Sequence, residues 1–405
     1  MKILVINCGS STIKYQLYSG DLKQVLAKGI AARLGEDESY LSQRTAGADY
    51  RRAQPIPTHR AAMELIVEAL LDPEHGVLEE IAEVGAVGHR AVHGADVFIS
   101  STLITDEVIH KMEECVPLAP IHNPANLLGI HAARRLFPDV PHVAVFDTSF
   151  HQTMPPKAFL YALPYEYYEQ HKIRKYGFHG TSCRYVSRRA AGMLGQPLGA
   201  LKMVICHLGN GVTIAAVDGG KSIDTSIGFA TFSGVMMGTR TGDIDPGLAF
   251  YLHRELGLSF EEIEHLYYFK SGLLGVSGVS NDMRVIVERA GQGHRFCQLA
   301  LDMFTYRLRS YIGSYAAALE GLDAIVFTAG IGENSPMVRS MACQGLEFLG
   351  VEVDPALNDA AIGRDMVIST GRARVKVLVV PTDEEQMIAM DTLSVAQAGG
   401  HLVNA

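Results

Sequence analysis

The sequence predicts a duplicated α/β fold in two lobes, and three observations lead to this prediction. The chain has 405 residues, which is long for a single hydrophobic core, so two domains are expected. An apolar run that ends in a glycine-rich turn and resumes as a second strand occurs twice, in residues 3–17 and again in residues 204–217. Alternating helical and strand patterns follow each copy. We therefore expect one lobe from residues 1–150 plus 386–405, a second lobe from residues 151–385, and a ligand-binding cleft between them.

The first half of the chain begins with three strands and continues with alternating helices and strands. The expected strands cover residues 3–6, 12–18, 25–31, 84–87 and 142–146. Residues 34–56 are polar and are expected to be irregular. Thr58 suits the N-cap of a helix that reaches about Leu71, because apolar residues recur on one face of this segment. A second helix is expected at residues 105–114, and Asn123 followed by proline predicts the N-cap of a third.

The second half repeats this order. Three strands are expected within residues 202–227, followed by a glycine-punctuated loop at residues 228–246 in which Arg240 is the single basic residue. Further strands are expected at residues 324–328 and 376–380, and helices at residues 259–267, 280–290, 295–319 and 384–398.

Composition and charge narrow the functional class. The net charge of −9 and the isoelectric point near 6.0 argue against nucleic acid or an anionic membrane as a partner. The N-terminus enters a strand directly and no apolar run is long enough to span a bilayer, so neither a signal peptide nor a membrane segment is expected. The six cysteines are scattered without a CxxC pair, which argues against a zinc site or disulfide framework and favours a reducing, cytoplasmic setting.

The two glycine-rich turns suit a phosphate, because a strand, a turn and a second strand can aim several backbone N–H groups at one anion. Two common nucleotide fingerprints are absent. Gly220-Lys221-Ser222 resembles the end of a P-loop, but Ala215 stands where the earlier glycine is required. The segment from Gly330 has Ser335 where a GxGxxG motif needs its last glycine. A nucleotide would therefore bind without either fingerprint.

Several polar side chains form a chemical set. Taken singly, Arg90 could be an ion-paired surface residue, His179 could fill a turn, and Asp147 could cap a helix. Arg240 is harder to explain structurally, because flanking glycines let backbone approach a ligand and its guanidinium suits phosphate or carboxylate. With Glu384, which opens a helix, the set suits phosphoryl transfer, where catalysis is positioning and neutralisation of charge on the moving group.

These residues lie in motifs that resemble the acetate kinase family, within the acetate and sugar kinase, Hsp70 and actin superfamily. The resemblance covers essentially the whole chain, and the order of its blocks makes it specific. The blocks are Asn7-Cys8-Gly9-Ser10-Ser11, Gly88-His89-Arg90-Ala91-Val92-His93-Gly94, Phe146-Asp147-Thr148-Ser149-Phe150-His151, Tyr176-Gly177-Phe178-His179-Gly180-Thr181-Ser182, His207-Leu208-Gly209-Asn210-Gly211, Met237-Gly238-Thr239-Arg240-Thr241-Gly242-Asp243-Ile244-Asp245-Pro246, Gly330-Ile331-Gly332-Glu333-Asn334 and Pro381-Thr382-Asp383-Glu384-Glu385.

The resemblance implies a duplicated actin-like (ribonuclease H-like) βββαβαβα fold and a homodimer. It implies reversible transfer of a phosphoryl group from ATP to acetate, giving acetyl phosphate and ADP, with Mg²⁺ or Mn²⁺. The residues that match metal-binding positions are Asn7 and Glu384. Those that match catalytic positions are Asp147, His179 and Arg240. Those that match acceptor-binding positions are Arg90, Val92, Ile121, Phe178 and Thr231. Those that match nucleotide-binding positions are Lys14, His207, Leu208, Gly209, Asn210, Gly211, Asp282, Met283, Arg284, Gly330, Ile331, Gly332, Glu333 and Asn334.

Three residues depart from the family pattern, and the departures leave the acyl substrate open. Thr231 stands where proline is usual, Cys183 where histidine is usual, and Asp383 where asparagine is usual. Val92 favours a small acyl group, but one methylene is worth only about 1–3 kcal/mol of discrimination. A kinase of propionate or another short-chain carboxylate is therefore the nearest alternative. An Hsp70- or actin-type ATPase and a sugar kinase are more distant ones, because the first needs a peptide-binding appendage or a polymer interface and the second a carboxylate base.

Overall fold

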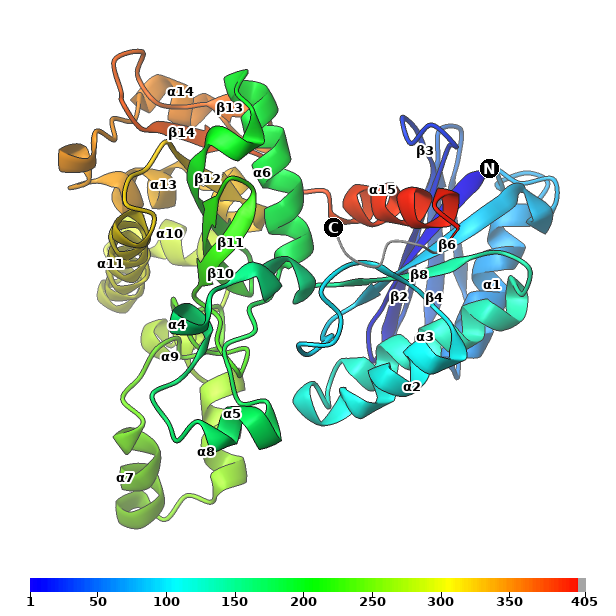
Figure 1. Cartoon of the computed structure of the whole chain (residues 1–405), viewed down its shortest axis with the longest axis horizontal. Helices are drawn as coiled ribbons and strands as arrows, with labels where there is room; N and C mark the ends of the chain where they lie inside the picture. The colour runs from blue at the N-terminus through cyan, green and yellow to red at the C-terminus, as the bar shows by residue number, and fades with distance from the viewer. Residues whose placement is uncertain (400–405) are drawn as a thin grey trace. The chain divides into compact units, whose positions relative to one another are not determined.

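The computed structural model describes residues 1–399, which form two compact units (Figure 1). The first unit combines residues 1–150 with the chain from residue 383, and the second comprises residues 151–382. The division falls at Asp383, the N-cap of the last helix, α15 (Glu384–Gln397), whereas the sequence-based boundary lay at residue 386. The whole of α15 therefore belongs to the first unit.

The first unit contains a mixed sheet with eight strands among the described residues, in the order β5-β4-β3-β2-β1-β6-β8-β7. The strands are β1 (Lys2–Cys8), β2 (Thr12–Tyr18), β3 (Val25–Ala32), β4 (Tyr40–Thr45), β5 (Asp49–Ala53), β6 (Val84–Ala91), β7 (Thr102–Leu103) and β8 (His142–Phe146). β1 pairs with β2 in antiparallel and with β6 in parallel orientation. Four consecutive residues of β1 are fully buried, as expected of a strand that helices cover on both sides.

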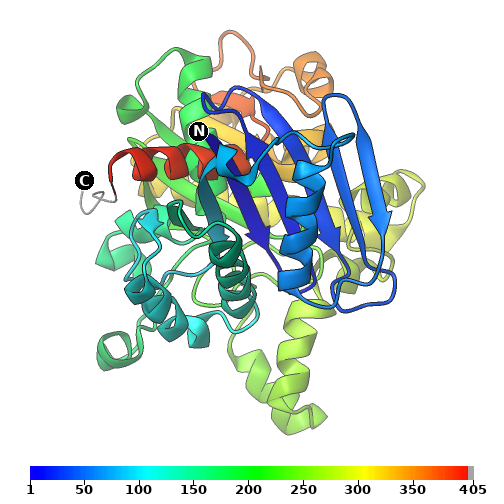
Figure 2. The same cartoon turned by 90° about the vertical axis from the view of Figure 1, so that its right-hand side faces the viewer.

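Helices cover both faces of this sheet. Helices α1 (His59–Leu71) and α3 (Asn123–Leu136) pack on one face, α15 packs over β1, β6 and β8, and α2 (Asp106–Glu114) packs on α3. Figure 2 shows α1 lying across the strands of this unit.

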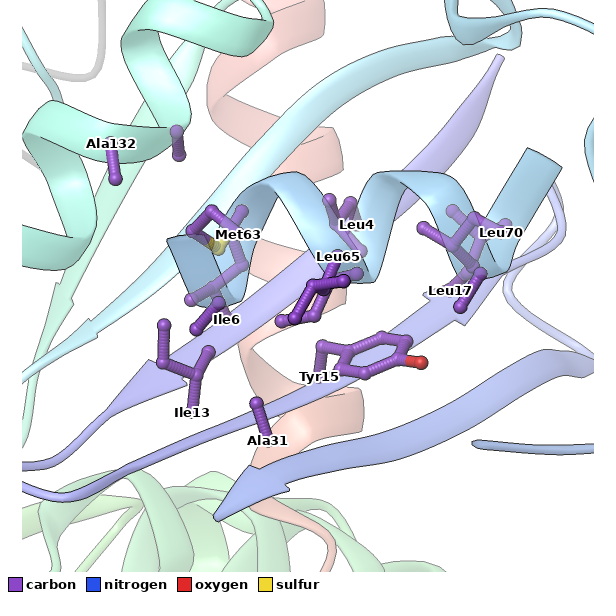
Figure 3. Close-up of a cluster of buried hydrophobic side chains, with 14 of the residues drawn as sticks. Leu4, Ile6, Ile13, Tyr15, Leu17, Ala31, Met63, Leu65, Leu70 and Ala132 are labelled. Atoms are coloured by element: carbon purple, nitrogen blue, oxygen red, sulfur yellow. The ribbon is translucent and has the colours of Figure 1, made fainter. Parts of the chain in front are cut away.

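The alternation of side chains along β1 places two apolar clusters on opposite faces of the sheet. Leu4 and Ile6 lie in the cluster under α1, where Met63 and Leu65 cover them (Figure 3). Ile3 and Val5 belong to the cluster that includes α15 residues such as Ile388. β1 is therefore fixed between two packed layers up to its end at Cys8. The polar turn that follows the strand starts from this rigid edge of the sheet.

The second unit repeats the plan. Its sheet has the order β11-β10-β9-β12-β14-β13 among the described residues, with β10 antiparallel and β12 parallel to β9. The strands are β9 (Lys202–Leu208), β10 (Val212–Asp218), β11 (Lys221–Thr225), β12 (Ala324–Thr328), β13 (Met366–Val367) and β14 (Lys376–Val379). The helices are α4 (Pro156–Phe159), α5 (Glu166–His171), α6 (Gly180–Leu194), α7 (Gly247–Leu256), α8 (Phe260–Phe269), α9 (Gly272–Ser277), α10 (Met283–Gly291), α11 (Arg295–Ala318), α12 (Ala329–Asn334), α13 (Pro336–Cys343) and α14 (Pro355–Ala360).

The expected duplicated α/β fold is confirmed, because β2 and β3 follow β1 in the same antiparallel arrangement in which β10 and β11 follow β9. The N-cap at Thr58 is also confirmed, since its side chain accepts a hydrogen bond from the backbone of Ala61. None of the helices among residues 1–399 is long and apolar enough to cross a membrane.

Two local expectations are wrong. Residues 34–56 are not irregular: β4 and β5 form a hairpin at the edge of the sheet, where outward positions are polar and only Leu41 and Gln43 of β4 are buried. The N-cap of α3 is His122, not Asn123, which lies inside the helix and uses its side chain elsewhere.

Candidate active site

An arginine and an aspartate meet at the ends of two parallel strands in the first unit. Arg90 lies near the end of β6, and Asp147 directly follows β8, its parallel neighbour. Nη2 and Nε of Arg90 lie 2.6 and 3.1 Å from Oδ2 of Asp147. The aspartate side chain is only 2% exposed, so the pair is largely withdrawn from solvent. The Asp147 carboxylate raises the pKa of Arg90, which stays charged.

Two further oxygen-bearing side chains approach the same guanidinium. Oδ1 of Asn7, at the end of β1, lies 3.4 Å from Nη1 of Arg90. Oε2 of Glu384, in the first turn of α15, lies 3.9 Å from Nε of Arg90. Burial raises the pKa of Glu384, Arg90 opposes the rise, and the Asp147 and Glu385 carboxylates add to it. The structure thus gathers Asn7, Arg90, Asp147 and Glu384 in one cluster.

The donor chemistry of this cluster fits a small hard cation. Among residues 1–399 no group of three or more His, Cys, Asp or Glu side chains is arranged to hold a metal ion. Mg²⁺ does not require such a group, because it is usually held by one or two carboxylates, waters and substrate phosphates. The partly buried carboxylate of Glu384 and the amide oxygen of Asn7 are donors of this kind.

The expected acyl-pocket residues are divided between the two units. Val92 follows β6 and is buried, whereas Ile121, before α3, is 61% exposed. Phe178 and Thr231 belong to the second unit. The sequence analysis missed two amides that hold the chain around Val92: the Asn126 side chain accepts from the Val92 N–H at 3.0 Å, and the Asn123 side chain accepts from the His93 N–H at 3.2 Å. Asn123 and Asn126 are three residues apart, so the sequence alone could have indicated that both amides lie on one face of the helix.

A histidine in the second unit has an unusual backbone conformation. His179 precedes α6 with φ of 56°, in the left-handed region that favours glycine. Its Nδ1 lies 2.8 Å from Oγ1 of Thr213 on β10, and its ring stacks on His207 with centroids 4.2 Å apart. His207 is fixed in turn, because its Nδ1 lies 2.8 Å from Oγ of Ser182.

Arg240 and His179 approach the same glycine. Nη1 of Arg240 donates to the Thr231 carbonyl at 2.9 Å, and burial lowers the pKa of the guanidinium without discharging it. A Cβ atom placed on Gly211 would lie 3.3 Å from Nε2 of His179 and 3.9 Å from Nη1 of Arg240. The two side chains therefore converge beside the glycine-rich turn that follows β9, where a Cβ atom would crowd the His179 ring, with Cε1 only 3.0 Å away.

A cavity of about 670 Å³ adjoins this turn within the second unit. Three of the expected nucleotide segments contribute to its lining, namely Gly209 with Asn210, residues 282–284, and Gly330 with Ile331 and Asn334. Arg284 is held in place by the Asp282 carboxylate, with Nη2 and Oδ2 2.6 Å apart.

Other expected nucleotide residues are directed elsewhere. The carbonyl of Gly332 accepts a hydrogen bond from Nη1 of Arg339, and Oε1 of Glu333 accepts one from the Thr382 N–H at 3.1 Å. His207 and Leu208 are buried in β9. Lys14, on β2 of the first unit, lines a separate cavity of about 640 Å³ with Lys28 and Glu385.

The model of the acetokinase family matches residues 2–390 of the chain. The chain belongs to the acetokinase family. Curated acetokinase relatives include the acetate kinase of Thermotoga petrophila, 53% identical over 402 residues, which cover 99% of this chain and 100% of the relative. The acetate kinase of Clostridium botulinum is 52% identical over 392 residues, which cover 97% of this chain and 98% of the relative.

Two solved structures also resemble the chain over nearly its whole length. The crystal structure of Porphyromonas gingivalis acetate kinase has a TM-score of 0.94 and 46% identity, covering 97% of this chain and 99% of that chain. A propionate kinase from Francisella tularensis subsp. tularensis has a TM-score of 0.90 and 38% identity, covering the same shares of the two chains.

Two departures from the acetokinase pattern have a structural explanation. Asp383 caps α15, because its Oδ1 accepts from the Gln386 N–H at 2.8 Å, and asparagine can cap a helix in the same way. Cys183 is fully buried on α6, where a small side chain of low polarity packs among its neighbours.

Proposed function

We propose that the protein transfers the γ-phosphoryl group of ATP to acetate, reversibly, giving acetyl phosphate and ADP. One observation carries the proposal: His179 and Arg240 converge beside Gly211, on a glycine-rich turn that also borders a nucleotide-sized cavity. Donors held at such a turn can neutralise the charge that develops on a phosphoryl group in transfer. Membership of the acetokinase family supports the choice of a carboxylate as acceptor.

The acceptor is assigned to Arg90. A carboxylate approaching the γ-phosphate is repelled by it, and a partly buried guanidinium can offset that repulsion through two parallel hydrogen bonds. Asp147 is a positioning residue in this scheme, because it holds Nε and Nη2 of Arg90 at 3.1 and 2.6 Å. Acetate needs no general base, since its carboxyl group is already ionised at neutral pH.

His179 and Arg240 are assigned to the equatorial oxygens of the transferred group. Both side chains are partly buried, so their hydrogen bonds act in a setting of reduced dielectric. Removing one such donor typically costs about 10²–10³ in kcat.

Asn7 and Glu384 are assigned to Mg²⁺, with Mn²⁺ as an alternative ion. When bound, the ion neutralises charge on the nucleotide phosphates and on the group being transferred. Asp147 would also orient the ion or a water bound to it, in addition to its contact with Arg90. The segments at residues 282–284 and 330–334 are assigned to the nucleotide, together with Lys14 and residues 207–211.

The acyl group is assigned to Val92, Ile121, Phe178 and Thr231. Val92 is larger than alanine and favours acetate over propionate by about tenfold or more, the value of one methylene. Phosphorylation of propionate is the second candidate function, because a propionate kinase from Francisella tularensis has a TM-score of 0.90 to this chain.

We also propose that the protein is a cytoplasmic homodimer that joins through helices α7 and α8. α7 has no fully buried residue among those described, and α8 has only Ile263. Large apolar side chains instead face outward on both helices: Leu248, Phe250, Tyr251, Leu256, Phe260 and Phe269. An apolar surface of this kind indicates an interface, and the same surface of a second copy can cover it across a two-fold axis.

Measurement of the molecular mass by light scattering tests this proposal. The double variant Phe250→Glu with Phe260→Glu should be a monomer, whereas Ile99→Glu in the first unit should remain a dimer.

The activity is tested by trapping acyl phosphate as the hydroxamate with purified protein, MgATP and a panel of acetate, propionate and butyrate. We expect the highest kcat/KM with acetate. A higher value with propionate would support the second candidate. ATP hydrolysis that needs no carboxylate, with no hydroxamate formed, would contradict both and favour an Hsp70- or actin-type ATPase.

A further inference from the structure

The hydroxyl of Thr213 lies at the centre of a buried network behind His179. Thr213 lies on β10 opposite His207 and is fully buried. Its Oγ1 is 2.8 Å from Nδ1 of His179 and 3.3 Å from the carbonyl oxygen of Phe178. Because a hydroxyl has one proton, it can donate to only one of these two atoms.

The Phe178 carbonyl already has another donor. Nε2 of His151 lies 3.1 Å from this oxygen, and a carbonyl can only accept, so the proton of His151 is on Nε2. Burial lowers the pKa of His151 to about 4, so the ring is neutral at pH 7. Its Nδ1 then accepts from the Ser222 hydroxyl at 2.8 Å. The carbonyl is therefore satisfied without Thr213.

We propose that the Thr213 hydroxyl donates to Nδ1 of His179 and thereby fixes the neutral ring in the tautomer that has its proton on Nε2. The shorter of the two distances points to this assignment, and the Phe178 carbonyl does not require the Thr213 proton, because His151 already donates to it. The tautomer makes Nε2 a hydrogen-bond donor at neutral pH without protonation of the ring. Nε2 is the ring nitrogen on the side of Gly211, since a Cβ atom on this glycine would lie 3.0 Å from Cε1 and 3.3 Å from Nε2 of His179, and 3.9 Å from Nη1 of Arg240.

Thr213 is thus a positioning residue for phosphoryl transfer, and the inference rests on the proposed kinase activity. The opposite tautomer would present a lone pair to the transferred group at the point where a donor is needed, and an incorrect histidine tautomer is known to cost enzymes much of their turnover. The ring is also held by its surroundings, because it stacks on His207 with centroids 4.2 Å apart while Nδ1 contacts Thr213.

Steady-state kinetics test the role of the hydroxyl. Thr213→Val keeps the shape and removes the donor, so kcat should fall by about tenfold to 100-fold, less than the 10²–10³ for losing the histidine donor itself. The KM for ATP should change less than about twofold, because only transition-state contacts are weakened. Thr213→Ser should restore kcat to within about threefold. A matched control is Thr225→Val, a buried threonine whose hydroxyl has no hydrogen-bond partner in the described structure.

The imidazole ¹⁵N chemical shifts provide a readout that a purely structural role would not move. In the wild type, Nε2 of His179 should have the shift of a protonated nitrogen and Nδ1 that of an acceptor, with the signals assigned by loss in His179→Asn. In Thr213→Val both shifts should move toward the average of exchanging tautomers. A wild-type spectrum with the proton on Nδ1, or unchanged kcat in Thr213→Val, would overturn the inference. Wild-type protein that forms no acyl phosphate would instead contradict the proposed function.

Discussion

Nη2 of Arg90 lies 2.6 Å from Oδ2 of Asp147, and the aspartate side chain is almost completely buried. The two residues end neighbouring parallel strands, so the sheet register holds their backbones in place. The Asp147 carboxylate, which is closer to Arg90 than that of Glu384, therefore orients the cation that we assign to the acceptor. This geometry leads to the first prediction.

Asp147→Asn should lower kcat/KM for acetate by more than about 100-fold while leaving the KM for ATP within about threefold. The substitution keeps the shape but leaves Arg90 without its buried counter-charge, and removing one partner of a buried ion pair typically costs about 3–5 kcal/mol. Kinetics at varied acetate and saturating ATP measure the effect. Asp139→Asn, an exposed carboxylate in the same unit, is the control. An equal rise in both KM values would argue that Asp147 supports the whole unit and not the acceptor site.

Arg240→Ala should lose about 10²–10³ in kcat with little loss of ADP affinity. Its Nη1 faces Gly211 and donates to the Thr231 carbonyl, whereas the cavity assigned to the nucleotide is lined by other residues. Arg240→Lys should recover little, because an ammonium cannot donate through a planar fork. Calorimetry of ADP binding, beside turnover, separates the two effects. The control Arg188→Ala, at an exposed arginine of α6, should match the wild type. Comparable losses of kcat and ADP affinity in Arg240→Ala would contradict a role of Arg240 in stabilising the transition state.

His151 should contribute an acid-sensitive part of the stability. Burial lowers its pKa from 6.5 to about 4, so the folded ring stays neutral while the unfolded chain takes up a proton below pH 6.5. The contribution is fully present above pH 6.5 and is lost as the pH falls toward 4, by about 3 kcal/mol in total. Denaturant unfolding of His151→Gln between pH 7.5 and 4.5 should therefore show a weaker pH dependence than the wild type. Parallel curves for the two proteins would show that His151 is not the group responsible.

Much of the fold could be predicted because its signals are local. Thr58 precedes an amphipathic run, and the helix α1 begins at the next residue. The hairpin of β4 and β5 could not be predicted in this way, since it is stabilised by pairing along the edge of β3 and its own residues are mostly polar.

In the candidate site, too, local sequence signals could be found and long-range contacts could not. Motif residues such as Arg90 and His179 could be found from the sequence, but the residues that hold them could not. Thr213 reaches His179 only through the register of β10 against β9, and the carbonyl of Phe178 needs His151 from outside the sheet. An isolated threonine or histidine has no sequence pattern that marks such a contact.

Arg339 is a further residue of this kind, and it leads to the last prediction. It is fully buried on α13 and donates only to uncharged oxygens among the described residues: the side chain and carbonyl of Asn358 and the carbonyls of Gly332, Glu333 and Ala361. Gly332 and Glu333 lie in α12, whose first residues line the cavity assigned to the nucleotide. The guanidinium of Arg339 thus joins the end of α12 to residues 358–361 through hydrogen bonds.

Arg339→Met should therefore raise the KM for ATP by about fivefold or more and reduce kcat less. It should also lower the free energy of unfolding by about 3 kcal/mol, because several buried carbonyls lose their donor and each unsatisfied group costs about 1–3 kcal/mol. Arg339→Lys should rescue neither property, since a lysine cannot reach all of these acceptors at once. The matched control is Arg374→Met, at an exposed arginine that donates to one carbonyl, that of Leu349. If Arg339→Met lost stability but kept the wild-type KM for ATP, Arg339 would support the fold of the unit without organising the nucleotide segment.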